Sequence, residues 1–510
     1  MSQEQSQAQS AAQASQAGQA AGVGPEVGGV HSNSVGSRLD LHARSGEYRA
    51  ALKAQARDAA CSHAWQRSQG RGDGPARAGI KTPEKVRQLQ RTLYRKAKAE
   101  PKYRFWSLYG ELMRRDVLEH ALQRVAANQG GPGVDGQRVE TILASPESQQ
   151  QWLDALQGEL GTKTYRPSPV RRVLIPKGHG GQRPLGIPTV KDRVVQMAAT
   201  LVLMPIFEAD FHPRSFGFRP RRNAHQAIEE IVRALRRGRT EVLDADLSKY
   251  FDTIPHRALV RLVARRISDG SVLRLLKRWL RAPGVEEERD GRRRIKPNAS
   301  GTPQGGVISP LLANLYLNGL DWAGNEKVVG QPVLVRYADD LVILAAPGQG
   351  AGLRERLRKW LQARGLSLNE EKTRLVNSRE GFNFLGFTVR WQRARAQGRW
   401  YGHVEPSAKS RQALRAQVRG LLNHWTHWKS IGEVVAALNP LLRGWSGYFH
   451  FRHSSRVMGQ LQGWVRACFK GWLWRKQGRH KGKWAGYPDE VLHERHGLWR
   501  LPTRAAWKTA

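Results

Sequence analysis

The tetrapeptide Tyr337-Ala338-Asp339-Asp340 lies between two short apolar runs, and this pattern predicts a tight β-hairpin. The first run is Pro332-Val333-Leu334-Val335 and the second is Leu341-Val342-Ile343-Leu344. Successive side chains of a strand point to opposite faces, so both runs can bury side chains in a sheet. The reversal between them lifts two adjacent carboxylates out of that sheet.

Helical patterns precede and follow this hairpin. Thr82 is a capping residue ahead of a proline at the first helical position, and apolar residues then recur at helical spacing at Val86, Leu89, Leu93 and Tyr94. The Gly-rich stretch 130–136 ends this helical region, and mixed strand and helix patterns run from about 165 to 389. Trp-rich, helix-like, basic sequence fills the remainder, which predicts an α+β protein with a helical C-terminal part.

The first 77 residues have a different composition. They are rich in Gln, Ser, Ala and Gly, contain no Lys or Arg before Arg38, and hold few apolar residues. We expect this segment to be disordered, because it cannot bury enough apolar surface to form a core.

Membrane insertion and disulfide bonding are both disfavoured. The most apolar stretch, 194–207, contains Gln196 and Pro205 and is too short to span a bilayer, while the first residues lack the basic and apolar regions of a signal peptide. Cys61 and Cys468 are the only cysteines, which leaves no disulfide framework and no paired-cysteine zinc site. We expect a cytoplasmic protein with no membrane partner and no zinc.

The charge of the chain favours a nucleic-acid partner. The 510 residues include 84 Lys and Arg against 43 Asp and Glu, a formal net charge of +41. Such a surplus repels the compact state unless a polyanion offsets it. Basic runs such as Arg219-Pro220-Arg221-Arg222 and Arg292-Arg293-Arg294 are spread along the chain. A solvated face is the alternative for any single run, whereas the whole set indicates a surface that follows a phosphate backbone.

Further carboxylates, in Asp244-Ala245-Asp246, end another apolar run. Carboxylates brought together repel one another unless a cation neutralises them, and oxygen ligands of this kind suit Mg²⁺. Two such ions roughly 3.5–4 Å apart would hold the attacking and leaving oxygens of a phosphoryl displacement. A polar turn is the alternative for Asp339-Asp340 taken alone. Beside the basic composition, the pattern indicates nucleotidyl transfer at a two-metal Mg²⁺ site.

An ordered series of motifs surrounds these carboxylates. It comprises Ile175-Pro176-Lys177, Arg183-Pro184-Leu185-Gly186-Ile187-Pro188, Ser215-Phe216-Gly217-Phe218-Arg219-Pro220, Asp246-Leu247-Ser248-Lys249-Tyr250-Phe251-Asp252, Thr302-Pro303-Gln304-Gly305-Gly306, Tyr337-Ala338-Asp339-Asp340, Glu371-Lys372-Thr373 and Phe384-Leu385-Gly386-Phe387. The series resembles the successive blocks of a group II intron reverse transcriptase. The segment 438–449, LNPLLRGWSGYF, resembles the maturase signature of the same proteins. The resemblance covers roughly residues 78 to 475.

The resemblance implies an α+β right-hand polymerase, with fingers, palm and thumb, and a C-terminal α-helical maturase domain. We expect a helical N-terminal extension of the fingers over 78–150, the reverse transcriptase fingers and palm over 151–395, the thumb and maturase helices over 396–475, and a basic tail over 476–510. The implied function is that of an RNA-directed DNA polymerase that also binds its encoding group II intron RNA to promote splicing and mobility, with a DNA primer or target and deoxynucleotides as substrates.

Two other functions stay open. One is the reverse transcriptase of a retron, diversity-generating or phage-defence system without a splicing role, and the other is an RNA chaperone that has lost polymerisation. The nuclease domain with paired cysteines that many relatives carry has no counterpart here, so we expect the endonuclease-lacking type. His493-Glu494-Arg495-His496 is one residue too short for the zinc-protease pattern, and we interpret it as a charged, exposed stretch.

The resemblance also assigns the residues of the polymerase site. Asp246, Asp339 and Asp340 would be the palm carboxylates that bind metal and carry catalysis, and Asp252 would be structural. Phe251 would lie under the sugar of the incoming nucleotide and reject a ribose 2′-hydroxyl, with a core phenylalanine as the alternative.

Four other residues would contact the nucleotide. Gln304, in a Gly-flanked loop, would position it, while Lys177 and Arg183 would face its triphosphate or, alternatively, the template backbone. Lys372 would protonate pyrophosphate, unless it is a surface lysine of an amphipathic helix.

Aromatic and basic residues alternate in the maturase segment. They are Trp425, Trp428, Trp445, Tyr448, Phe449 and Phe451 with Arg443, His450 and Arg452. This mixture can pack a helical thumb and can also stack on unpaired bases. We expect most of the aromatics to be core and assign RNA binding to Arg443, Trp445 and Tyr448.

Overall fold

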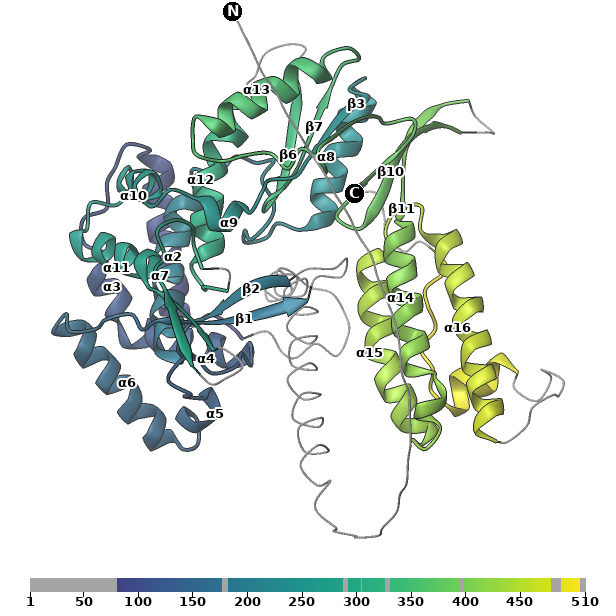
Figure 1. The fold of residues 1–510 in the computed structure, drawn as a ribbon, viewed down its shortest axis with the longest axis horizontal. Helices are drawn as coiled ribbons and strands as arrows, with labels where there is room; N and C mark the ends of the chain where they lie inside the picture. The colour runs from purple at the N-terminus through teal and green to yellow at the C-terminus, as the bar shows by residue number, and fades with distance from the viewer. Residues whose placement is uncertain are drawn as a thin grey trace, which may run out of the picture. The chain divides into compact units, whose positions relative to one another are not determined.

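A computed structural model of the chain describes residues 80–176, 182–287, 292–303, 305–325, 331–394, 398–477 and 488–504 (Figure 1). The segment 1–77, with its predicted disorder, lies outside these ranges, as do Lys177 and Gln304. Helices and β-sheets alternate through the described residues, and the predicted α+β class is confirmed.

The first described helices pack on a single buried helix, α7 (Val190–Glu208). They are α2 (Glu84–Ala99), α3 (Tyr109–Met113) and α4 (Arg115–Ala127), with α5 (Val139–Ile142) and α6 (Pro146–Gly161) packed on α4. Helix α7 contains the most apolar stretch of the sequence, and it is buried on nearly all sides because its apolar residues lie all round it. None of the helices that the structure describes is long and apolar enough to cross a membrane.

The predicted helix α2 is present, but it begins one residue later than predicted, and its predicted cap is wrong. The N-cap is Pro83 and no side chain caps the helix. Thr82 is therefore one residue too early to reach the free N–H groups, and its carbonyl instead accepts a hydrogen bond from Arg87 Nη2 at 3.3 Å. The predicted helix break at 130–136 is confirmed, since α4 ends at Ala127 and α5 begins at Val139.

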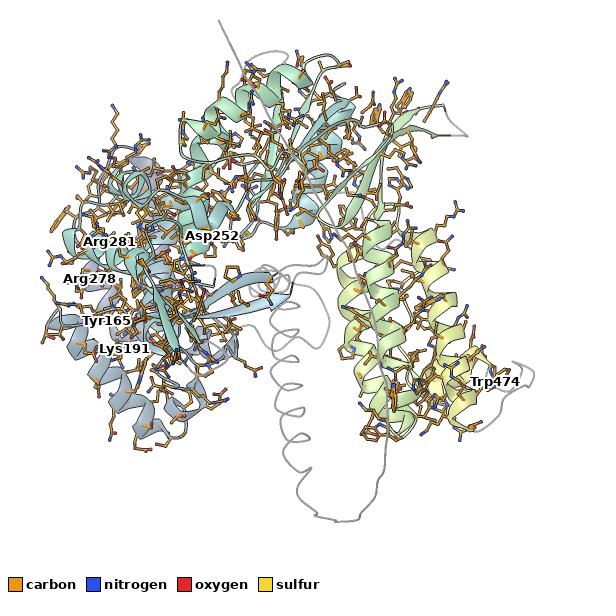
Figure 2. All side chains as sticks on the ribbon, in the orientation of Figure 1. Tyr165, Lys191, Asp252, Arg278, Arg281 and Trp474 are labelled. Carbon is orange, nitrogen blue, oxygen red and sulfur yellow. The ribbon has the colours of Figure 1, made fainter. Side chains whose placement is uncertain are left out.

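A four-stranded sheet with the order β2-β1-β4-β5 follows this helical region. Its strands are β1 (Val170–Pro176), β2 (Gln182–Ile187), β4 (Gly284–Glu287) and β5 (Arg293–Lys296), and all neighbours are antiparallel except β1 and β4. Helices α10 (His256–Ala264) and α11 (Gly270–Arg281) pack on each other before β4, and α11 carries Arg278 and Arg281 (Figure 2).

A second four-stranded sheet has the order β6-β7-β3-β8 and carries the predicted hairpin. Its strands are β3 (Glu241–Ala245), β6 (Val333–Tyr337), β7 (Asp340–Ala345) and β8 (Arg374–Asn377). Leu334, Leu341 and Ile343 join a core that also contains α7, α12 (Ser309–Ala323) and α13 (Gly350–Gln362). Val335 and Val342 join a second core against α8 (Ala224–Arg236). Both faces of the sheet are buried, which explains why its strands are continuously apolar rather than alternating.

The helical C-terminal part begins after a three-stranded sheet, β9 (Phe382–Phe384), β10 (Phe387–Arg393) and β11 (Trp400–Pro406). The predicted boundary at 395 falls inside the β10–β11 hairpin. Helices α14 (Ala408–Leu421), α15 (Ile431–Phe449) and α16 (Ser455–Lys476) share one core, which is centred on Leu438, Leu461 and Trp472 (Figure 1).

The described residues 488–504 pack on this core. Leu492, Leu498 and Leu501 are buried in it. The prediction that 493–496 is an exposed stretch is wrong for both of its histidines, which are half-buried, and His493 Nδ1 lies 2.7 Å from the Leu498 carbonyl while its Nε2 lies 3.1 Å from Gln462. Only Glu494 and Arg495 of the four are exposed. Since the turn is helical, side chains three apart share one face, so His493 and His496 point inward together, and a local charge pattern does not reveal this.

His212 gives the fold a testable pH dependence. Its ring is buried against Trp322, and Nδ1 accepts a hydrogen bond from the Arg214 N–H at 3.1 Å. Burial, together with the charges of Arg214, Arg219 and Arg336, lowers the pKa of His212 to about 4. An unfolded histidine binds a proton near pH 6.5, so the unfolded state binds more protons between about pH 6.5 and pH 4. Stability contributed by neutral His212 is therefore lost as pH falls through this window.

We predict that His212→Phe reduces the acid-induced loss of stability. The measurement is the midpoint of thermal unfolding at neutral pH and near pH 5, with His424→Phe, at an exposed histidine, as the matched control. The prediction fails if the His212 variant and the control lose stability equally on acidification.

Candidate active site

The predicted hairpin is present, and its turn consists of Ala338 and Asp339. Tyr337 pairs with Asp340, so Asp340 is the first residue of β7 and only Asp339 of the two carboxylates lies in the turn itself. Ala338 has a φ of +59°, as the first position of a two-residue hairpin turn requires, and this costs a non-glycine residue conformational energy. The surrounding structure must therefore hold the turn in place.

Gly217 supports the turn from one side. A Cβ at this position would lie 2.3 Å from the Ala338 nitrogen, so only glycine allows so close an approach. The flanking backbone adds to the edge of β6, since the Phe216 N–H donates to the Arg336 carbonyl at 2.9 Å and the Arg336 N–H donates to the Arg214 carbonyl at 3.1 Å. The motif that contains Gly217 is thus a structural support of the carboxylate turn.

Arg336 supports the turn from below and is fully buried. Its guanidinium forms a two-pronged ion pair with Asp321 on α12, with N···O distances of 2.7 and 2.5 Å. It also donates to Asn314 Oδ1 at 2.8 Å, to Ser215 Oγ at 2.7 Å and to the Ala338 carbonyl at 2.7 Å. One side chain therefore connects the turn to α12 and to the segment before α8.

Carboxylates from two strands converge at the turn. Ala245, the last residue of β3, pairs with Leu341 of β7, which brings Asp246 next to Asp340. Crowding by protein atoms and the charges of Asp339, Asp246 and Asp244 raise the pKa of Asp340 to about 7, although part of its surface is exposed to solvent. The other three carboxylates are thus close enough to Asp340 to disfavour its ionisation.

Asp244 and Lys372 lie at the edge of this cluster and change its charge balance. Burial and the charge of Asp246 raise the pKa of Asp244 to about 6. Lys372 Nζ lies 3.2 Å from Asp246 Oδ2 and brings a positive charge to the cluster. Lys372 is mostly exposed and lies in a turn before β8, so the alternative that placed it on an amphipathic helix is wrong.

The donor set of the cluster fits a hard divalent cation. All of its ligand atoms are carboxylate oxygens, and the mutual repulsion that raises the pKa of Asp340 is what a bound cation would relieve. Within the described residues, no group of three acidic, histidine or cysteine side chains is arranged tightly enough to enclose one ion. A site that leaves positions open for water and phosphate oxygens has few protein ligands of this kind.

Phe251 lies on the short helix α9 (Tyr250–Thr253), which follows Asp246 in the chain, and is half-buried. Its carbonyl accepts a hydrogen bond from the Thr302 N–H at 2.7 Å, and a Cβ on Gly301 would lie 2.5 Å from that carbonyl. The backbone of α9 therefore fixes the loop that leads to Gln304. Asp252 also holds this loop, because its carbonyl accepts a hydrogen bond from Ser300 Oγ at 2.9 Å.

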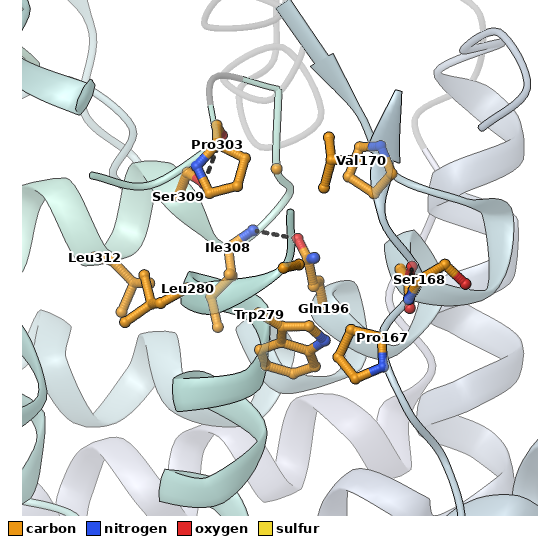
Figure 3. Close-up of a pocket in the computed structure, with 14 residues that line it drawn as sticks. Pro167, Ser168, Val170, Gln196, Trp279, Leu280, Pro303, Ile308, Ser309 and Leu312 are labelled. Atoms are coloured by element: carbon orange, nitrogen blue, oxygen red, sulfur yellow. Dashed lines mark hydrogen bonds between the residues drawn. The ribbon is translucent and has the colours of Figure 1, made fainter. Parts of the chain in front are cut away.

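The remaining nucleotide-site predictions fall largely outside the description. Lys177 and Gln304 are not among the described residues, and of Arg183 only the backbone, in β2, is described. A small pocket lies beside the loop that contains position 304, lined among others by Gln196, Trp279, Pro303 and Ile308 (Figure 3). The Ile308 N–H approaches Gln196 Oε1 at 3.5 Å, which connects this loop to α7.

The predicted RNA-binding residues differ in exposure. Arg443 is exposed and lies over the ring of Trp499 at 4.7 Å. Trp445 is half-buried and contacts Phe449. The Tyr448 hydroxyl donates to the Leu385 carbonyl at 2.9 Å, which joins α15 to the β9–β10 turn. The structure thus gives Trp445 and Tyr448 internal packing contacts, and their part in RNA binding stays a prediction.

Sequence reasoning missed the residues that hold the site together: Ser215, Asn314, Asp321 and Arg336. One local signal was present, since Arg336 is a charged residue inside an apolar run and directly precedes Tyr337. A charge in a buried strand requires a buried partner. The identity of that partner, 15 residues earlier in the chain, is visible only in the structure.

Arg336 yields a prediction about stability. Arg336→Met leaves Asp321 charged and buried without its partner, so we expect a loss of about 3–5 kcal/mol in the free energy of unfolding. The double variant Arg336→Met/Asp321→Leu recovers most of this loss. Denaturant unfolding measures both, with Arg354→Met, at the exposed Arg354–Glu370 pair, as a control that changes stability by less than about 1 kcal/mol. Equal effects of Arg336→Met and the control would contradict the assignment.

Two family descriptions match the chain. Residues 175–389 match the reverse transcriptase (RNA-dependent DNA polymerase) family, and residues 411–487 match the maturase-specific domain of group II introns. The first range contains both carboxylate-bearing strands, and the second contains most of α14 and all of α15 and α16. The predicted right-hand polymerase with a helical maturase domain is thereby confirmed.

Individual relatives agree with these matches. The chain is 35% identical to protein YkfC of Escherichia coli (strain K12), over 61% of this chain and 90% of that protein. It is 30% identical to the group II intron-encoded protein LtrA of Lactococcus lactis subsp. cremoris, over 57% of each. It is 26% identical to an uncharacterised 91 kDa protein in the cob intron of Schizosaccharomyces pombe, over 67% of this chain and 50% of that protein.

Among solved structures, apo telomerase from Candida tropicalis, truncated from its C-terminal domain, matches 47% of this chain and 58% of that chain at 15% identity and a TM-score of 0.35. The chain spans only about half the length of the LtrA and cob-intron relatives. The family matches and the 35% identity to a relative that is covered almost throughout are the findings that decide membership. The chain therefore belongs to the group II intron-encoded reverse transcriptases, which are RNA-directed DNA polymerases with a maturase domain.

Proposed function

We propose that Asp246, Asp339 and Asp340 carry RNA-directed DNA synthesis in this protein, and that the helical domain holds the group II intron RNA during splicing and mobility. The observation that carries the first part is the convergence of carboxylates from β3 and from the β6–β7 turn, which raises the pKa of Asp340 to about 7. The match of 411–487 to the maturase-specific domain supports the second part over a retron or phage-defence role.

Asp246, Asp339 and Asp340 would hold two Mg²⁺ ions, with Asp244 as a nearby buried carboxylate that adds negative charge. When bound, Mg²⁺ would neutralise this charge and activate the 3′-hydroxyl of the primer for attack on the nucleotide phosphate. The residues of the chain contribute position: the Arg336 network fixes the turn, so Asp339 needs little rearrangement when substrate arrives.

Lys372 would act on the leaving group. Its side chain is 67% exposed and its ammonium lies beside Asp246, so it can reach a phosphate oxygen in the site and donate a proton there. Lys177 and Arg183 would neutralise the triphosphate, and Gln304 would position the nucleotide base and sugar. Phe251 would lie against the sugar, where its ring leaves no space for a 2′-hydroxyl.

Asp339→Ala tests the carboxylate assignment. We expect primer extension on an RNA template to fall by at least about 1,000-fold, whereas RNA affinity stays nearly unchanged because the basic surface is intact. Mg²⁺-dependent extension and filter binding measure the two properties, with Glu370→Ala, at an exposed carboxylate outside the cluster, as the control. An equal loss of extension and RNA affinity would refute the proposed role.

Phe251→Ala tests sugar selection. Removing the ring opens space for a 2′-hydroxyl, so we expect ribonucleotide incorporation relative to deoxynucleotide incorporation to rise by roughly 10-fold or more. Phe251→Tyr, which keeps the ring, is the matched control and should preserve selection. If the alanine variant rejects ribonucleotides as strongly as the unmodified protein, Phe251 is not the selecting residue.

A further inference from the structure

Two tryptophans in the loop between α14 and α15 are unusually exposed. Trp425 is 74% exposed and Trp428 is 77% exposed, whereas Trp472, directly behind this loop, is fully buried. An indole presents a large apolar surface to water, and exposing two of them within four residues costs solvation free energy. The prediction that most aromatics of this segment are core therefore does not hold for this pair.

The loop is held rigidly from its inner side. Trp472 donates from Nε1 to the Thr426 hydroxyl oxygen at 3.0 Å. Lys476 Nζ donates to the carbonyls of His427 and Lys429 at 2.6 and 2.8 Å. The backbone on both sides of Trp428 is thus fixed by α16. The two indoles are presented in a defined position, which lowers the entropy cost of binding a ligand.

The spacing of the two tryptophans places them on one side of the loop. His424–Thr426 forms a 3₁₀ turn, in which residues three apart lie one above the other. His427, the next residue, keeps a right-handed helical conformation, so Trp428 follows Trp425 on the same side. His424 lies against Trp425, with ring centroids 4.5 Å apart. The His424 and Trp425 rings thus form a small aromatic surface, and Trp428 follows three residues further along the chain.

The surface around the pair is cationic. Lys429 Nζ lies 5.3 Å from the centroid of the Trp428 ring. Burial is the largest cause that lowers the pKa of His427, and the charges of Arg475, His424 and Lys476 lower it further. Positive charge is therefore concentrated around this loop. The carboxylate of Glu433 is already used, because it accepts from the Ser430 N–H and hydroxyl, each at 2.8 Å, in the cap of α15.

We propose that Trp425 and Trp428 form a stacking platform for unpaired bases of an RNA strand, whose phosphates lie against Lys429 and Arg475. The inference rests on the proposed function, because the platform lies within the residues that match the maturase-specific domain. Every nucleobase has a flat face that can stack on indole, and the surrounding cations attract the strand. A protein partner would favour an apolar surface with less charge at its centre.

The test is the double variant Trp425→Ala/Trp428→Ala. Affinity is measured by fluorescence anisotropy at fixed salt for a short labelled oligouridine and for a blunt RNA duplex of the same length. Since stacking contributes about 1–3 kcal/mol per base, we expect oligouridine to bind at least about 10-fold more weakly, with duplex affinity almost unchanged. Trp106→Ala, at a tryptophan that is 71% exposed in another region, should leave both affinities unchanged.

A second variant separates stacking from folding. Trp425→Phe/Trp428→Phe keeps aromatic rings and should retain most of the affinity for oligouridine. If the double alanine variant binds oligouridine as tightly as the unmodified protein, the platform is overturned, and the two tryptophans would contact a different partner. An equal loss for oligouridine and duplex overturns it too, because it indicates a charge effect. Primer extension by the unmodified protein tests the polymerase proposal separately. If the unmodified protein does not extend a primer but the double alanine variant still loses only oligouridine affinity, the platform stands and the polymerase proposal fails.

Discussion

The buried ion pair between Arg336 and Asp321 is the interaction on which the carboxylate turn depends. Burying two charges costs solvation energy that their attraction roughly offsets, so the net gain in stability is small. What the pair provides is geometry, because the same guanidinium holds the Ala338 carbonyl, Asn314 and Ser215. A turn with a positive φ at a non-glycine residue keeps its shape only when its surroundings determine it.

The position of this turn brings several negatively charged carboxylates close together, and they repel one another. Asp339 and Asp340 are held next to Asp244 and Asp246, and burial together with the charges of these carboxylates raises the pKa of Asp340. Lys372 relieves part of this repulsion through its contact with Asp246. Under the proposed function, a scaffold that holds these carboxylates together would bind a divalent cation with little rearrangement during phosphoryl transfer.

Aromatic residues of the helical domain divide between two tasks. Tyr448 and Phe449 face the β9–β10 turn, where Gly386, with a φ of +81°, lies close to the Phe449 ring. Trp425 and Trp428 face solvent at the opposite end of α15, beside Lys429. One helix thus connects the β9-β10-β11 sheet to a cationic aromatic surface, and both tasks use side chains of the same chemical type.

The sequence by itself determined the α+β class, the hairpin, the helices and the carboxylates, because these follow from local periodicity and from motifs with fixed spacing. It could not decide which tryptophans are exposed, since Trp425 and Trp472 have similar basic neighbours and differ only in what packs on them. Nor could it pair Arg336 with Asp321 or show that Gly217 and Ala338 are in contact. Those facts depend on segments distant in sequence, and only the tertiary structure brings such segments together.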